Sequence, residues 1–128
     1  MYVTATPFFA ALLALLYLVL SVRVGRVRTK AKVSIGDGGD MALTRAMRAQ
    51  ANFNEYVPLT LLIIAFLEMR AVSLYVVCIL LTLLLVGRIL HAIGISPVKE
   101  ITLCRMFGII FTFIPLLVGS IWLLVTYL

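Results

Sequence analysis

The sequence has 128 residues, of which 64% are apolar and only 12% are charged. An ordinary soluble domain is roughly 45–50% apolar and about 25% charged, and one soluble core of this length could not bury so much apolar surface. The composition therefore excludes a soluble enzyme, a disordered chain and a two-domain protein. Its apolar runs do not alternate with polar residues, which argues against a transmembrane barrel.

Four apolar segments predict a single all-α domain, an integral membrane four-helix bundle in a lipid bilayer, because a spanning helix needs about 20 apolar residues. The spans are expected at about residues 2–22, 41–67, 71–92 and 104–127. The first segment carries no charge, and no basic residue precedes it as one would in a signal peptide. We therefore expect it to remain as a membrane helix.

The connections between these segments carry the charge that predicts orientation. The first connection, residues 23–40, contains Arg23, Arg26, Arg28, Lys30 and Lys32. It then runs through the glycine–aspartate segment GDGGD at 36–40, which predicts a tight turn and not a phosphate loop, since no Gly-Lys-Ser/Thr follows. The third connection carries Lys99 and leads to Arg105, whereas the second is short and has only Arg70 beside Glu68.

The positive-inside rule assigns the first and third connections to the cytoplasm and both termini to the other side. The formal net charge of +6 is thus explained by topology, and nucleic acid is not an expected partner. Cys78 and Cys104 have no metal-ligand spacing, so no metal site is expected.

A polar stripe on the second helix is the candidate site. At about 100° per residue its members fall within an arc of about 80°. They are Arg45, Arg48, Asn52 and Glu55. Ionisable groups near the bilayer are costly and usually face a partner or a water-filled cavity.

On the third helix, Arg88 and His91 are three residues apart and share a face. Glu55 could pair with Arg48 or Arg88 and only stabilise the bundle. One carboxylate cannot neutralise Arg48, Arg88 and Arg105, however, so the excess positive charge favours an anionic ligand.

The segment RAQANFNEYVPL at residues 48–59 closely resembles the R-A-x-x-N-x-x-E-Y-x-P-L segment of the MAPEG proteins, the membrane-associated proteins of eicosanoid and glutathione metabolism. The turn GDGG at 36–39 is similar to the same position in bacterial members. GRILH at 87–91 is similar to the G-R-x-x-H segment of the prostaglandin E synthase branch. The resemblance extends over nearly the whole chain.

This resemblance implies a homotrimer of four-helix subunits, in a bacterial inner membrane, with a glutathione site between neighbouring subunits near the cytoplasmic side. It also implies glutathione conjugation, peroxide reduction or isomerisation of small lipophilic substrates. Glutathione carries two carboxylates, which arginines bind through paired hydrogen bonds.

By resemblance, Arg26 and Arg48 bind those carboxylates, and Asn52 and Glu55 hold the amides or the ammonium. The full set of expected glutathione-binding residues is Arg26, Arg48, Gln50, Asn52, Glu55, Tyr56, Arg88 and His91. For Gln50 and Tyr56, ordinary packing is an equal alternative, and His91 has a structural alternative.

Also by resemblance, Arg105 at the start of the last span is the catalytic group, since a nearby cation lowers a thiol's pKa. Ile95 stands where the leukotriene and prostaglandin branches carry a tyrosine, and Met106 where the prostaglandin branch has a serine. These departures favour a transferase or peroxidase over a prostaglandin isomerase.

Two other functions compete with a glutathione transferase or peroxidase. One is a scaffold that binds glutathione or lipid without catalysis. The other is a small multidrug transporter. Such proteins share a glutamate within the membrane on their first helix, whereas the first helix expected here has no ionisable group.

Overall fold

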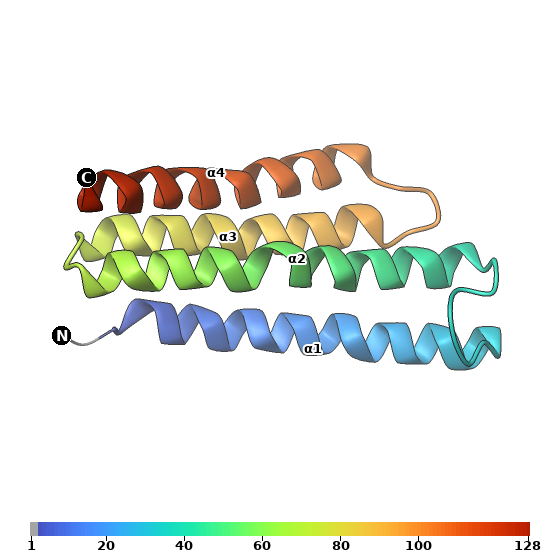
Figure 1. Ribbon diagram of the computed structural model, residues 1–128. Coiled ribbons are helices and arrows are strands. Elements are labelled where there is room, and N and C mark those ends of the chain that lie inside the picture. Colours follow the sequence, from blue (N-terminus) through green and yellow to red (C-terminus); the bar gives the residue numbers. More distant parts are fainter. Residues whose placement is uncertain (1–2) are drawn as a thin grey trace.

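The computed structural model describes residues 3–128 as four helices packed side by side in an up-and-down bundle (Figure 1). They are α1 (Ala5–Ala31), α2 (Met41–Met69), α3 (Leu74–Ile95) and α4 (Thr102–Tyr127). The α1–α2 and α3–α4 loops lie at one end, called here the loop end, and the chain termini lie at the other (Figure 1). The predicted all-α four-helix membrane bundle is confirmed.

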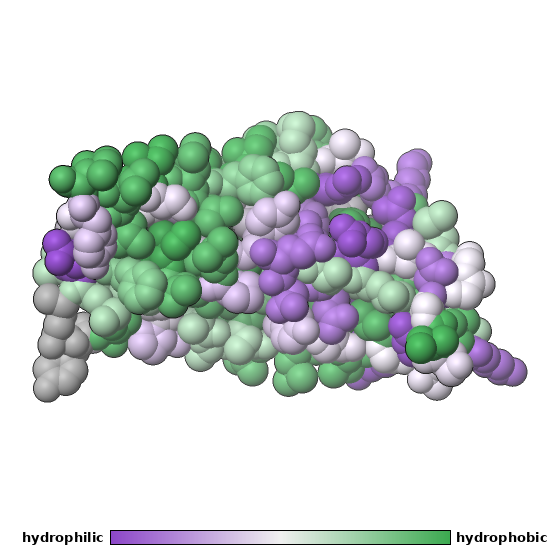
Figure 2. All heavy atoms as spheres, viewed as in Figure 1, coloured by the Kyte–Doolittle hydropathy of each residue, from purple (hydrophilic) through white to green (hydrophobic). Residues whose placement is uncertain are grey.

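Three of the four helices are long and apolar enough to cross a membrane, namely α1, α3 and α4. The helix α2 is not among them, because its first half carries Arg45, Arg48 and Glu55 along with other polar side chains. Figure 2 shows the same division on one face of the molecule. Hydrophilic residues gather over the half toward the loop end, and the half toward the termini is almost entirely hydrophobic.

Helix α1 is longer than its charge-free segment. The polar connection was expected to begin at Arg23, but the helix continues to Ala31 and ends where Lys32 adopts a φ of 56°. Arginine, lysine and alanine are good helix formers, and no proline interrupts the segment. At about 1.5 Å per residue the helix is about 40 Å long, so it exceeds a hydrocarbon core of about 30 Å. Tyr2, where the first span was expected to begin, lies outside the described residues.

The short α2–α3 connection differs from the expected one in a similar way. Glu68 belongs to α2, and α3 begins at Leu74, not at residue 71. The Glu68 carboxylate accepts hydrogen bonds from the backbone N–H groups of Thr4, Ala5 and Thr6 at 2.7, 2.8 and 2.9 Å. It therefore caps the N-terminus of α1 and joins two helices at the end of the bundle where the termini lie.

The 32–40 loop forms the tight turn that its glycines and aspartates predict. Gly36, Gly38 and Gly39 all have positive φ. The Asp37 carboxylate accepts hydrogen bonds from the Gly39 N–H at 3.0 Å and from the Thr44 hydroxyl at 2.9 Å. These bonds lower the pKa of Asp37 below its usual value.

Helices α3 and α4 make the closest pair in the bundle, and glycines allow their approach. A Cβ atom on Gly94 would overlap the backbone of Arg105, and one on Gly108 would overlap the backbone of His91. This contact sets Arg105 at the first turn of α4 directly against α3. The fold thereby fixes two expected site residues relative to each other.

Candidate functional site

An exposed polar row follows α2 near the loop end. Arg48 Nη1 lies 3.7 Å from Glu55 Oε1, and their side chains are 58% and 47% exposed. Asn52 Nδ2 donates to Glu55 Oε2 at 3.5 Å. The pairing of Glu55 with Arg48, one of the expected possibilities, is present but is long and open to solvent. Such a pair contributes little to stability and leaves its groups available to a ligand.

Behind this row, Arg88 lies inside the bundle. It is 1% exposed, and His91 beside it is 2% exposed. Arg88 Nη2 donates to Asn52 Oδ1 at 2.9 Å and lies 3.2 Å from His91 Nδ1. Its Nη1 donates to the Thr112 hydroxyl of α4 at 3.3 Å, and its guanidinium lies over the ring of Phe53 at 5.7 Å. This cluster joins α2, α3 and α4.

Among residues 3–128, no carboxylate lies within ion-pair distance of Arg88, and its Nε is buried without a hydrogen-bond partner. The possible Arg88–Glu55 pair is therefore not formed. Asn52 connects the two residues instead, because it both accepts from Arg88 and donates to Glu55. A buried cation without a counter-ion is costly, so an anion bound beside the α2 row would offset part of that cost.

Arg105 is held by a carboxylate that the charge count from the sequence omitted. Its Nη1 donates to both oxygens of Glu100, at 3.0 and 2.9 Å. Arg45 Nη1 donates to the same carboxylate at 3.3 Å and to the Ile95 carbonyl at 3.3 Å. Counting Glu55 alone against Arg48, Arg88 and Arg105 therefore left out Glu100, which pairs with Arg105. Glu100 is the single acidic residue after position 70, and its place five residues before Arg105 was the sequence signal for this pair.

Gln50 and Tyr56 have contacts within the chain. Gln50 Nε2 donates to the Ser21 hydroxyl of α1 at 2.9 Å. The Tyr56 ring packs against Phe113 of α4, with 5.3 Å between ring centroids. Both residues are only partly buried, so the packing alternative is realised for each while some of their surface remains accessible.

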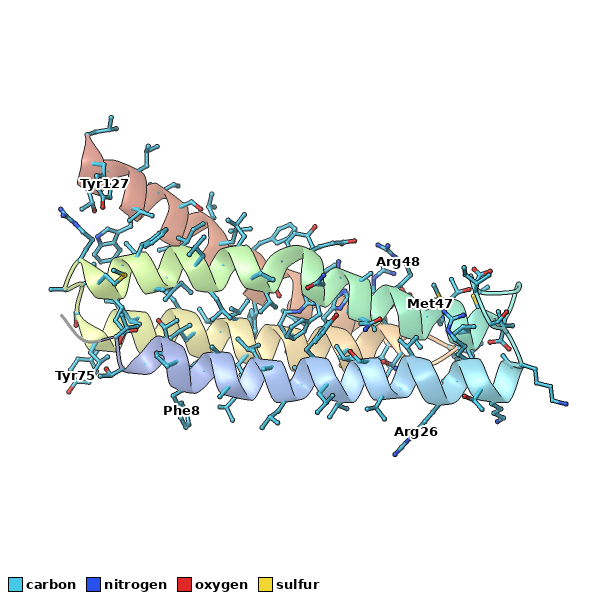
Figure 3. The ribbon with its side chains drawn as sticks, turned by 60° about the horizontal axis from the view of Figure 1, so that its bottom comes forward. Phe8, Arg26, Met47, Arg48, Tyr75 and Tyr127 are labelled. Atoms are coloured by element: carbon cyan, nitrogen blue, oxygen red, sulfur yellow. The ribbon has the colours of Figure 1, made fainter. Side chains whose placement is uncertain are left out.

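Arg26 and Arg48 point away from opposite sides of the molecule (Figure 3). Both are exposed. A single copy of the chain therefore does not direct both arginines at one small ligand. Arg26 of one copy would have to meet Arg48 of another.

Thr112 is a functional candidate that the sequence did not reveal. It is fully buried, accepts from Arg88 and donates to the Gly108 carbonyl at 2.8 Å. Nothing in an apolar run distinguishes this threonine from Thr126, which donates only to its own helix at the other end of α4.

Apolar grooves lie toward the termini, away from the polar row. One of them, about 500 Å³, lies between α2 and α4. Its lining residues are Ile63, Phe66, Ser120, Leu123, Leu124 and Tyr127. Within residues 3–128, no group of three His, Cys, Asp or Glu side chains could hold a metal ion.

The sequence profile of the MAPEG family matches residues 6–125 of this chain, which is nearly its whole length. The chain belongs to the MAPEG family. The match covers α2 and α3 completely, nearly all of α1 and α4, and the whole polar site. The protein is accordingly an integral membrane protein of a family that includes glutathione transferases.

Curated relatives include the inner membrane protein YecN of Escherichia coli strain K12 and of E. coli O6:H1 strain CFT073. Each is 37% identical to this chain over 86 residues, which is 67% of this chain. The match spans 66% of the length of each relative. No solved structure matches the chain.

Proposed function

We propose that this protein is a membrane-bound, glutathione-dependent transferase or peroxidase that acts on lipophilic electrophiles. The observation that carries the proposal is the Arg48–Asn52–Glu55 row on α2 in front of a buried Arg88, which has no counter-ion among residues 3–128. The row offers a guanidinium for a carboxylate, an amide for a peptide group and a carboxylate for an ammonium. Those are the polar groups of glutathione.

The tripeptide is proposed to lie along α2, with Arg48 binding one of its carboxylates through paired hydrogen bonds. Glu55, which is only loosely paired with Arg48, would receive the ammonium of the ligand. Arg88 would add favourable charge from inside the bundle through Asn52. Arg26 would bind the second carboxylate from a neighbouring copy, because it points away from Arg48 in its own chain.

That last requirement calls for at least two copies side by side, and we propose the homotrimer that the resemblance implies. The site would then be completed at each contact between subunits. The same proposal places the protein in a bacterial inner membrane, crossed by all four helices, with the loop end in the cytoplasm. The basic residues of both loops support that orientation.

Arg105 is proposed to stabilise the glutathione thiolate, because a nearby cation favours the charged form of a thiol. In conjugation, the thiolate sulfur forms a bond to the electrophilic carbon, and the leaving group departs with its electron pair. In peroxide reduction, the sulfur attacks one oxygen, the O–O bond breaks and the other oxygen leaves as an alcohol after protonation. A second glutathione then converts the glutathione sulfenic acid to the disulfide and water.

Purified full-length protein in detergent tests this proposal with two substrates, a chlorinated dinitrobenzene and a lipid hydroperoxide, each with glutathione. We expect turnover of at least one substrate, and its loss in Arg48→Ala. Glutathione binding without turnover would support the scaffold instead. Absence of both binding and turnover would contradict the proposal.

A further inference from the structure

The α3–α4 loop brings one carboxylate against two arginines of different helices. Glu100 receives hydrogen bonds from Arg105 of α4 at 2.9 and 3.0 Å and from Arg45 of α2 at 3.3 Å. The Glu100 side chain is 24% exposed, Arg45 is 22% exposed and Arg105 is 43% exposed. The cluster is therefore partly open to solvent.

The loop is short and is fastened at both ends. The Ile101 N–H donates to the Gly94 carbonyl at 3.0 Å, which closes the loop onto the end of α3. Arg23 of α1 donates to the Ser96 carbonyl at 2.7 Å. Since a Cβ on Gly94 would overlap the Arg105 backbone, the base of α4 also has little freedom. The backbone of the loop therefore holds Glu100 in a fixed position beside Arg45 and Arg105.

The charges of the cluster do not cancel. Two guanidinium groups share one carboxylate, so one positive charge remains. Lys99 on the loop, Arg23 on α1 and His91 on α3 are the basic groups nearest the cluster, whereas the acidic residues Asp37 and Asp40 belong to the other loop at this end, where they bond to Gly39, Leu43 and Thr44. Arg45 Nε is also buried, and it has no hydrogen-bond partner in the described part of the chain. The cluster is short of negative charge and of hydrogen-bond acceptors.

We propose that Glu100 is a positioning residue that acts as a displaceable counter-ion: it occupies Arg105 and Arg45 in the ligand-free protein, and an incoming anion competes with it for these two guanidinium groups. This inference rests on the proposed function insofar as the natural anion is the glutathione thiolate. The competition between Glu100 and an anion for Arg45 and Arg105 does not depend on that anion being glutathione.

The pairing with Glu100 reduces the ability of Arg105 to stabilise a thiolate. While both oxygens of Glu100 accept from Arg105, the field that the guanidinium offers to a thiolate is weakened by the adjacent negative charge. Glu100 thereby limits thiolate formation until the carboxylate and the sulfur exchange places. The 43% exposure of Arg105 leaves room for a ligand to reach it from the solvent side.

Glu100→Gln removes the competing charge while keeping the size and shape of the side chain. The matched control is Asp40→Asn, which removes one negative charge at the same end of the bundle. Asp40 caps α2 through the Leu43 N–H at 2.8 Å, and asparagine is an equally good cap. Glu100→Asp keeps the charge on a shorter side chain and serves as the conservative rescue.

The first measurement uses inorganic sulfate, with no glutathione present. Thermal unfolding of the full-length protein in detergent is followed over a sulfate series at constant ionic strength. We expect sulfate to stabilise Glu100→Gln at about two- to fivefold lower concentration than the parent, because the arginines no longer have a competing anion. Asp40→Asn and Glu100→Asp should follow the parent. Equal sulfate dependence in Glu100→Gln and the parent would overturn the proposal.

The second measurement is the pH titration of the thiolate of bound glutathione by its ultraviolet absorbance. The midpoint should lie lower in Glu100→Gln than in the parent, by roughly 0.3–0.7 pH units. A purely structural loop carboxylate would lower the unfolding temperature and leave this midpoint in place, which would contradict the proposal. A sulfate effect without any bound thiolate would support the counter-ion and reject glutathione as the ligand.

Discussion

Arg48 and Arg88 are arginines on neighbouring helices with opposite surroundings. Arg48 is exposed and shares a 3.7 Å contact with Glu55, whereas Arg88 is 1% exposed and bonded to neutral groups. An exposed guanidinium gains a full pair of hydrogen bonds when a carboxylate arrives, since it gives up only water and a weak ion pair. A buried one acts through its charge and through Asn52. We therefore assign contact with the ligand to Arg48 and a supporting field to Arg88.

Arg48→Ala should weaken glutathione binding by about 1.5–3 kcal/mol, the magnitude of a hydrogen bond to a charged group. Isothermal titration calorimetry in detergent measures the glutathione affinity of the variant and of the parent. Lys30→Ala is the matched control, because Lys30 is an exposed cation near the same end of the bundle with no place in the site. Loss of affinity in the control to the same degree would show a general charge effect and remove Arg48 from the site.

The Asp37 carboxylate provides a pH test at the loop end. Hydrogen bonds from Gly39 and Thr44 lower its pKa below the usual 3.8. Because the folded pKa is lowered, the stabilisation is fully present above the unfolded pKa and is lost as the pH falls through the folded value. Thr44→Val removes one donor and should reduce the fall in unfolding temperature between about pH 5 and pH 3. An unchanged acid dependence in Thr44→Val would contradict this origin.

At the scale of elements, the α3–α4 pair determines where Arg105 stands. Glycines at 87, 94 and 108 let the two backbones approach closely, and Gly94 contacts the Arg105 backbone itself. In membranes, small residues promote helix association because packing and not water exclusion drives it. The geometry of the proposed thiolate site thus depends on residues that carry no polar group.

Gly94→Ala should force the two helices apart at the base of α4 and destabilise the protein by about 1–3 kcal/mol, the usual cost of overpacking. The matched control is Gly25→Ala in α1, where an added Cβ meets nothing within 4 Å. That change should be neutral or stabilising by up to about 1 kcal/mol, because alanine is the better helix former. Thermal unfolding in detergent compares the two. Equal stability of both variants would refute the close contact.

At the scale of the whole molecule, α1, α3 and α4 were predictable because long apolar runs are an unambiguous signal. The end of α1 was not predictable, because the segment from Arg23 to Ala31 is polar and still forms a helix. A change from apolar to charged residues does not mark where a helix ends. The α2 row was predictable from helical periodicity. The Glu100 bridge was not, because it depends on how a six-residue loop folds back onto α2 and α4.

The arrangement of the bundle also constrains orientation. Both basic loops lie at one end, and the chain termini lie at the other. A reporter fused after Leu128 should therefore be non-cytoplasmic, because the basic loops stay on the cytoplasmic side. A fusion in the 32–40 loop is the control and should be cytoplasmic. A cytoplasmic signal from a stable C-terminal fusion would reverse the placement of the site.

The central claim is that this protein activates glutathione as a thiolate beside Arg105. Its most direct test is the ultraviolet absorbance of the thiolate on mixing glutathione with the full-length protein at neutral pH, compared with Arg105→Leu. Free thiols have a pKa of about 8.5 and are mostly protonated at neutral pH, so the absorbance appears only where the site lowers that pKa. We expect thiolate in the parent, and its loss in Arg105→Leu with most of the binding retained through Arg48, Asn52 and Glu55. Equal thiolate absorbance in Arg105→Leu and the parent would contradict the claim.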